Sequence, residues 1–200
     1  MELQRQGSSM ADHEQKLIDS MIRHPVIAAV RNVSEVQQAL ASPVKIIFLL
    51  AGSINDLAST CQLITENGKT CFLHLDLIAG LKPDQSGIQY IAEQVRPGGI
   101  ITTRPAGIKW AKAAGLLTVQ RIFLLDSTAL HDGRRNIRTC RPDLVEVLPG
   151  VAETAIRMAV QQFERPLIAG GLISQRSEVL AALAAGALAV STGKRELWTL

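Results

Sequence analysis

Short, almost uninterrupted apolar runs recur along the whole chain and define its most regular pattern. They stand at residues 25–30, 45–50, 70–77, 98–103, 117–125, 144–149, 166–171 and 187–192. A strand with one solvent-exposed face alternates apolar and polar residues, whereas a parallel strand covered by helices is apolar almost throughout. The runs therefore predict eight buried parallel strands.

The segments between these runs carry the signals of helices. Asp84 stands before one such segment, Pro105 starts another, and Gly68 and Gly115 follow two of them as C-caps. Eight strands that alternate with helices predict an α/β fold, a single-domain (β/α)8 barrel of the TIM type, over residues 21–200. A doubly wound open sheet is the alternative, because the pattern alone does not fix the number of strands.

The first residues do not share this pattern. Residues 1–20 are mostly polar, contain Gly-Ser-Ser, and predict a disordered leader outside the barrel.

Composition narrows the class of protein without deciding its function. The chain is 47% hydrophobic and 20% charged, with a formal net charge of +3, which permits an anionic partner without requiring one. No apolar run is long enough to span a bilayer, so no membrane partner is expected. Three cysteines without paired or metal-ligand spacing indicate a reduced, cytoplasmic protein with no metal site.

Polar residues follow the C-terminal ends of the predicted strands, where (β/α)8 barrels build their functional sites. We expect Arg31, Asp76, Arg104 and Glu146 to surround the mouth of the barrel and to bind the hydroxyl-bearing part of a small ligand. His74 lies two residues before Asp76 and is expected deeper, as a histidine of the core.

Two glycine-containing loops follow the last two predicted strands, where barrels of this type often bind a phosphate group. Backbone N–H groups can approach an anion closely where there is no side chain. The predicted phosphate-binding residues are Gly170, Gly171, Ser174, Thr192, Gly193 and Lys194. The alternative is that the glycines only allow a tight turn from strand to helix.

A basic stretch at residues 131–141 is the best candidate for binding RNA. Arg134, Arg138 and Arg141 recur at helical spacing, with Arg135 beside them, and such a stripe can neutralise phosphates. A solvated helix face is the alternative. Aromatic residues make up 4% of the chain, so stacking on bases is not indicated.

Several longer phrases make the chain resemble a known family, the glycerol uptake operon antiterminator regulatory proteins. They include PVIAAVRN, LHLDLIAGLKPDQSGIQYI, VQRIFLLDS, VEVLPG, IAGGLI and STGKRELW, and they run from about Pro25 to Trp198. The resemblance implies a small barrel without a catalytic role or cofactor, whose effector is glycerol 3-phosphate. It further implies binding to the leader mRNA of a glycerol-utilisation operon, read-through of a terminator and stabilisation of the transcript.

The competing interpretation is an enzyme, an isomerase or transferase that acts on a small phosphorylated substrate. Glu146 with His74 or Arg104 could serve such a reaction. A Schiff-base aldolase is disfavoured, because Lys45 and Lys69 stand at the starts of strands, on the wrong rim. A homo-oligomer is compatible with the sequence. Trp110 and Trp198 on outer helices could form its contacts, but packing at the edge of the core is the expected use of both.

Overall fold

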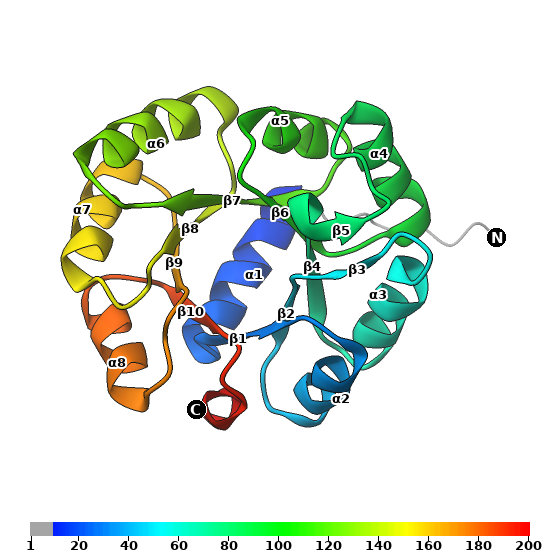
Figure 1. The fold of residues 1–200 in the computed structure, drawn as a ribbon, viewed down its shortest axis with the longest axis horizontal. Coiled ribbons are helices and arrows are strands. Elements are labelled where there is room, and N and C mark those ends of the chain that lie inside the picture. Colours follow the sequence, from blue (N-terminus) through cyan, green and yellow to red (C-terminus); the bar gives the residue numbers. More distant parts are fainter. Residues whose placement is uncertain (1–9) are drawn as a thin grey trace.

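The predicted barrel is confirmed by the structure, a computed structural model that describes residues 10–200. Eight parallel strands close into one barrel in the order β1-β10-β9-β8-β7-β6-β4-β2 (Figure 1). They are β1 (Val26–Val30), β2 (Ile46–Leu49), β4 (Thr70–His74), β6 (Gly99–Thr102), β7 (Leu117–Phe123), β8 (Leu144–Leu148), β9 (Leu167–Gly170) and β10 (Ala189–Thr192). Each lies inside one of the apolar runs, and the closed order excludes the open sheet.

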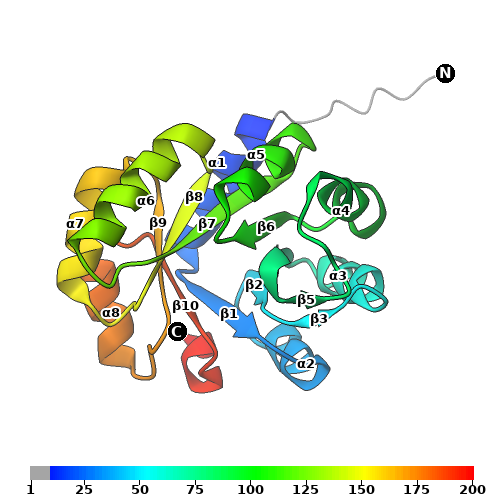
Figure 2. The same ribbon diagram turned by 45° about the horizontal axis from the view of Figure 1, so that its top comes forward.

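Helices surround the barrel and cover its outer face (Figures 1 and 2). They are α2 (Val33–Ala41), α3 (Leu57–Glu66), α4 (Gln85–Tyr90), α5 (Pro105–Ala113), α6 (Ser127–Cys140), α7 (Glu153–Phe163) and α8 (Arg176–Ala184). Short turns η1 (Leu75–Leu77), η2 (Ile91–Val95) and η3 (Arg195–Thr199), and a small pair of strands, β3 (Gly52–Ser53) and β5 (Ile78–Ala79), complete the fold. None of the helices within residues 10–200 is long and apolar enough to cross a membrane.

Side chains at alternate strand positions point into the barrel and fill it. Phe48 and Phe72 meet there with ring centroids 5.7 Å apart, and Ile27, Ile101 and Val119 pack in the same cluster. A second, larger cluster fills the layer between the strands and the outer helices. The alternation therefore decides whether a polar residue near a strand end faces the mouth of the barrel or a helix.

Helix α1 (Met10–Arg23) lies across the N-terminal end of the barrel (Figures 1 and 2). Leu17 and Met21 are one helical turn apart and are buried in the cluster that fills the barrel. The prediction of a disordered leader is therefore wrong for residues 10–20, because this apolar pair anchors a helix. The prediction for residues 1–9 lies outside the described residues.

Candidate functional site

A cavity of about 380 Å³ opens at the C-terminal ends of the strands, and we call it the mouth pocket. Its lining residues are Ala29, Arg31, Leu50, Arg121, Glu146, Leu148, Gly171, Leu172, Ile173, Ser191, Thr192, Gly193 and Lys194. The pocket thus lies at the rim where the sequence predicts the ligand, and it is bordered by the loops that follow β9 and β10.

A buried ion pair forms the floor of the mouth pocket. Arg121 and Glu146 are register partners on β7 and β8, and the Arg121 Nε atom donates to Glu146 Oε2 at 2.6 Å. Ser191 on β10 donates its hydroxyl to Glu146 Oε1, also at 2.6 Å. The Glu146 side chain is completely buried and that of Arg121 is 10% exposed. We call Arg121, Glu146 and Ser191 the mouth network.

Arg121 retains hydrogen-bonding capacity for a ligand. A guanidinium carries five N–H donors, and in the described part of the chain only the Nε donor of Arg121 has a hydrogen-bond partner. Sequence reasoning missed Arg121 and Ser191 as site residues. The usable signal was two-residue alternation, because Leu117 and Val119 point into the barrel and Arg121 follows in the same series.

Gly170 has a different role from the predicted one. A Cβ atom on Gly170 would lie 2.5 Å from Glu146 Oε1 and 2.6 Å from Ser191 Oγ. Gly170 does not line the mouth pocket. Glycine is therefore required there to leave room for the mouth network, and a contact of Gly170 with phosphate stays a prediction.

Gly171 and Gly193 lie at the pocket, as predicted from their loops. Gly171 has a φ of +82°, a conformation that favours glycine. Neither amide donates any of the hydrogen bonds found outside helices and strands in residues 10–200. These two amides and the exposed Lys194 add to the donors that Arg31 and Arg121 offer in the same pocket.

Thr192 lines the pocket, but its hydroxyl is used within the protein. The hydroxyl donates to the carbonyl of Ile173 at 2.8 Å and accepts from the Lys194 amide at 3.0 Å. The Thr192 carbonyl accepts from the indole of Trp198 at 2.9 Å. Thr192 therefore ties the two loops together instead of donating to a ligand, and buried Trp198 packs inside the chain instead of offering an exposed contact.

Ser174 does not line the mouth pocket. Its amide and hydroxyl donate to Glu178 Oε2 at 2.7 and 3.2 Å, and the Gln175 amide donates to the same atom at 2.9 Å. These hydrogen bonds from the Ser174 and Gln175 amides lower the pKa of Glu178. The start of α8 already holds a carboxylate of its own, so the prediction that Ser174 binds phosphate is not supported by its placement.

The four predicted mouth residues separate into two groups. Arg31 and Glu146 line the mouth pocket, whereas Asp76 and Arg104 do not. Asp76 Oδ2 accepts from the Thr103 amide at 2.8 Å, and the Arg104 Nε atom lies 3.4 Å from Asp76 Oδ1. Asp76 sits in η1, beyond the end of β4, and its contacts stabilise the loop after β6.

His74 lies beside the mouth network in the barrel. It is 2% exposed, and its Nδ1 atom has no hydrogen-bond partner in residues 10–200. Burial, and next the charge of Arg121, lower the pKa of His74 to about 4. His74 is therefore a neutral imidazole of the core at pH 7.

The predicted RNA-binding arginines are all exposed on or just after α6. Arg135 pairs with Asp132 at 2.9 Å, and Arg138 lies 4.0 Å from Glu164. Helix α6 starts at the mouth and runs toward the base, so Arg141 at its C-cap lies at the opposite end from the mouth pocket. In residues 10–200, no group of three His, Cys, Asp or Glu side chains could hold a metal ion.

Comparison with known proteins places this site in a family. Residues 26–198 match the model of the glycerol-3-phosphate responsive antiterminator family. A glycerol uptake operon antiterminator regulatory protein from Listeria monocytogenes is 34% identical, with 86% of this chain and 94% of that chain covered and a TM-score of 0.84. A glycerol uptake operon antiterminator-related protein from Thermotoga maritima is 32% identical, with 88% and 98% covered and a TM-score of 0.78.

An uncharacterized protein of Escherichia coli K12, YgcP, is 32% identical over 92% of this chain and 96% of its own length. Barrel enzymes are more distant. An N-acetylmannosamine-6-phosphate 2-epimerase from Clostridium perfringens is 15% identical, with 98% of this chain and 95% of that chain covered and a TM-score of 0.70, which shows a shared fold alone. The resemblance seen in the sequence is confirmed: the chain belongs to the glycerol-3-phosphate responsive antiterminator family.

Proposed function

We propose that the mouth pocket binds glycerol 3-phosphate and that binding makes the chain act on transcription. One observation carries this proposal: Arg31, Arg121 and Lys194 line a single cavity in which Glu146 is the only acidic lining residue. Because Glu146 is already paired with Arg121, the cavity carries an excess of positive charge. That excess suits a small dianion.

The two ends of the pocket suit the two ends of glycerol 3-phosphate. The amides of Gly171 and Gly193, with Lys194 and Arg31, would hold the phosphate group. The glycerol hydroxyls would lie over the mouth network, where the free guanidinium N–H groups of Arg121 donate to them. Inorganic phosphate would fill the first part alone.

Calorimetric titration tests this assignment directly. We expect glycerol 3-phosphate to bind, inorganic phosphate to bind more weakly, and glycerol not to bind. Lys194→Gln should lower the affinity for glycerol 3-phosphate at least about tenfold, which is the equivalent of one charge-assisted hydrogen bond. Arg195→Gln is the matched control, since Arg195 is the next residue and is exposed but does not line the pocket. Equal affinities for the two variants would contradict the assignment.

We further propose that the liganded chain binds the leader mRNA of a glycerol-utilisation operon, promotes read-through of a terminator and stabilises the transcript. Such a role requires the cytoplasm, where transcripts form. The exposed arginines of α6 would supply phosphate contacts, with Arg134 and Arg141 carrying more of the affinity than Arg135 and Arg138, which face acidic partners.

Gel-shift titration with the leader RNA tests the RNA proposal. Arg134→Glu with Arg141→Glu should weaken binding and reduce its dependence on salt. Arg157→Glu on α7 is the control, because Arg157 is equally exposed on the surface but outside the basic stripe. Unchanged RNA affinity at low salt in the double variant would remove α6 from the interface.

A non-catalytic role fits the mouth network better than the enzymatic alternative. Both carboxylate oxygens of Glu146 already accept hydrogen bonds, so Glu146 is not poised as a base. The lysines at the barrel strands, Lys45 and Lys69, stand at the N-terminal rim, away from the mouth pocket. We therefore propose that the chain senses its ligand and does not transform it.

A further inference from the structure

A second cavity of about 350 Å³ lies at the opposite end of the barrel, between α1 and the loops that lead into the strands. We call it the base pocket. Its lining residues are Met10, His13, Lys16, Leu17, Ser20, Thr70, Pro97, Gly98, Gly115, Leu116 and Leu117. No residue is shared with the mouth pocket, so any function of the base pocket is separate from the one proposed above.

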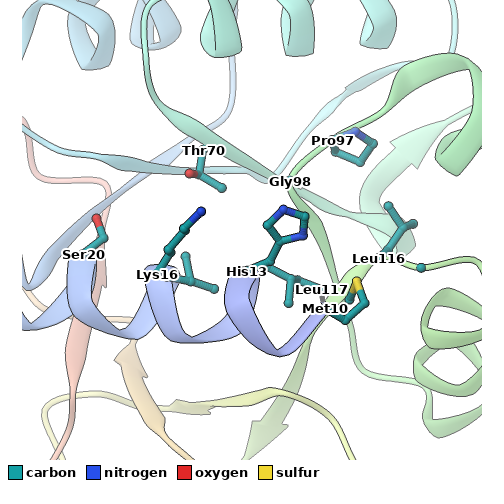
Figure 3. Close-up of a pocket in the computed structure, with 11 residues that line it drawn as sticks. Met10, His13, Lys16, Ser20, Thr70, Pro97, Gly98, Leu116 and Leu117 are labelled. Atoms are coloured by element: carbon teal, nitrogen blue, oxygen red, sulfur yellow. The ribbon is translucent and has the colours of Figure 1, made fainter. Parts of the chain in front are cut away.

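One end of the base pocket is polar and positively charged. Figure 3 shows the side chains of His13, Lys16 and Ser20 rising from the same face of α1, with the ammonium group of Lys16 directed toward Thr70. Two hydroxyl groups and an ammonium group thus face one space. Such donors are the usual partners of a carboxylate or phosphate group.

No acidic side chain offsets this charge within the base pocket, because none of its eleven lining residues is Asp or Glu. Two further lysines lie close by. Thr70 directly follows Lys69, and the Thr70 amide donates to the carbonyl of Lys45 at 2.9 Å. Burial, and next the positive charge of Lys45, lower the pKa of Lys69.

Among the described residues, the ammonium group of Lys69 is hydrogen-bonded within the protein, whereas that of Lys16 is not. The Lys69 ammonium donates to the carbonyls of Ser42 and Val44 at 2.7 and 2.6 Å. The Lys16 side chain is exposed, and its ammonium group has no hydrogen bond or ion pair within residues 10–200. The charge that is available to a ligand in the base pocket is therefore that of Lys16.

The other end of the base pocket is apolar. Met10, Leu116 and Leu117 gather beyond His13, and Pro97 closes the upper side in the view of Figure 3. Met10 is 41% exposed, so its apolar side chain is accessible at this end of the cavity. A ligand that filled the whole cavity would bring an apolar body to this end and an anionic group to the other.

We propose that the base pocket is a second binding site, for a small organic anion with an apolar body. The carboxylate or phosphate group binds between Lys16, Ser20 and Thr70, and the body packs against Met10, Leu116 and Pro97. Such a ligand touches both α1 and the barrel, so it fastens the first turns of α1 to the base. Leu17 and Met21 anchor only the later turns.

Amide NMR spectra of the whole chain can test this site without interference from the mouth pocket. The probes are phenyl phosphate and benzoate, which differ in the anionic group, and phenol and inorganic phosphate, which each supply one half of the ligand. We expect both aromatic anions to shift the amides of Ser20, Gly98, Gly115 and Leu117. Phenol and inorganic phosphate should shift them far less.

Three variants make the result decisive. Lys16→Gln should lower the affinity of the base pocket for both aromatic anions at least about fivefold, as expected for loss of a charge-assisted contact. Met10→Glu should abolish binding of both, because it places a carboxylate at the apolar end. Lys109→Gln, on the exposed face of α5, is the control and should change neither.

The shifts at Gly171 and Gly193 report the mouth pocket in the same spectra, so the two sites succeed or fail separately. The proposal would be overturned if the amides at the base did not shift at probe concentrations up to about 10 mM. A specific site for a small ligand binds more tightly than that. Base shifts that persist unchanged in Lys16→Gln would overturn the proposal as well.

Discussion

Two buried carboxylates, one on β8 and one just before it, lie near opposite ends of the barrel and are used in different ways. Glu146 lies near the mouth and pairs with Arg121 inside the barrel. Asp143, just before β8, accepts from the amide and the hydroxyl of Thr118 at 2.8 and 2.7 Å and pairs with Lys112 of α5. Both carboxylates are buried, and both have a cation and a hydroxyl group as partners.

The difference lies in the donors that remain. Around Asp143 the acceptors and donors are matched: the Asp143 amide donates back to the Thr118 hydroxyl at 3.1 Å, and Asp143 lines neither the mouth pocket nor the base pocket. Around Glu146 the cation keeps free N–H groups at the wall of a cavity. The Asp143 ion pair faces neither cavity, whereas an ion pair whose cation keeps spare donors at a cavity wall is equipped to bind a ligand.

Removing Glu146 should give the largest effect. Glu146→Ala leaves the Arg121 guanidinium buried without its counter-charge, and we expect the free energy of unfolding to fall by about 3–5 kcal/mol. Urea denaturation measures this loss. Glu146→Gln keeps one oxygen that can accept from Arg121 Nε, and its new NH2 group can donate to the Ser191 hydroxyl, so it should lose less. A loss below about 1 kcal/mol for Glu146→Ala would show that Arg121 reaches solvent more readily than its burial indicates.

His74 should make the mouth end of the barrel sensitive to acid. Its folded pKa of about 4 lies below the unfolded value of about 6.5, so protons bind the unfolded chain first. Stability is unaffected above pH 6.5, declines as the pH falls below it, and has lost up to about 3 kcal/mol once the pH is below 4.

The His74 contribution can be isolated by comparing pH series. Urea denaturation of the wild-type chain and of His74→Gln between pH 7 and pH 4 should give curves that converge as the pH falls. Parallel curves would mean that His74 titrates alike in both states and that its burial does not penalise the imidazolium ion.

Asp143→Ala should separate stability from binding. The substitution removes three hydrogen bonds and leaves the Thr118 amide buried, so we expect a loss of about 2–3 kcal/mol. Affinity for glycerol 3-phosphate should stay within about twofold of wild type, because Asp143 lines no part of the mouth pocket. Denaturation and calorimetry on the same variant test both statements. A large loss of affinity would show that Asp143, like Glu146, contributes to ligand binding.

The strands of this barrel could be predicted because most of their positions are apolar on both faces, which leaves nearly continuous runs in the sequence. The pair β3 and β5 was not predicted, since two residues per strand carry no periodicity. Helix α1 was mistaken for a leader because its polar residues outnumber the buried pair Leu17 and Met21. The spacing of that pair was the available signal.

The site was predictable at the level of loops and not at the level of side chains. Arg31, Gly171, Gly193 and Lys194 follow strand ends and do meet at one pocket. Asp76 looked equivalent, but one 3-10 turn after β4 directs it to Thr103 instead. Where a strand stops and which face its last residue takes depend on register, and a sequence pattern leaves both uncertain by a residue.

Backbone strain also differs between the two ends of the barrel. Four non-glycine residues of the described chain have positive φ. Arg96, Arg141 and Glu164 are C-caps of helices, where a left-handed residue is usual. Leu172 is the fourth, with a φ of 64°; it follows Gly171 at the mouth pocket, and its side chain is 76% exposed. A large apolar residue is costly in this conformation and exposed here, so stability does not account for it.

Leu172→Asn should therefore stabilise the chain slightly and lower its affinity for glycerol 3-phosphate. Asparagine adopts the left-handed conformation more readily than leucine, and we expect a gain of about 0.5–1 kcal/mol in urea denaturation. Glycerol 3-phosphate should bind a few-fold more weakly, because Leu172 lines the pocket and its side chain would lose apolar contact with the proposed ligand. Glu164→Asn, a change at a C-cap far from the mouth, is the control and should leave affinity unchanged. If Leu172→Asn is less stable than wild type, the leucine is packing against the loop, and the mouth stores no strain for binding.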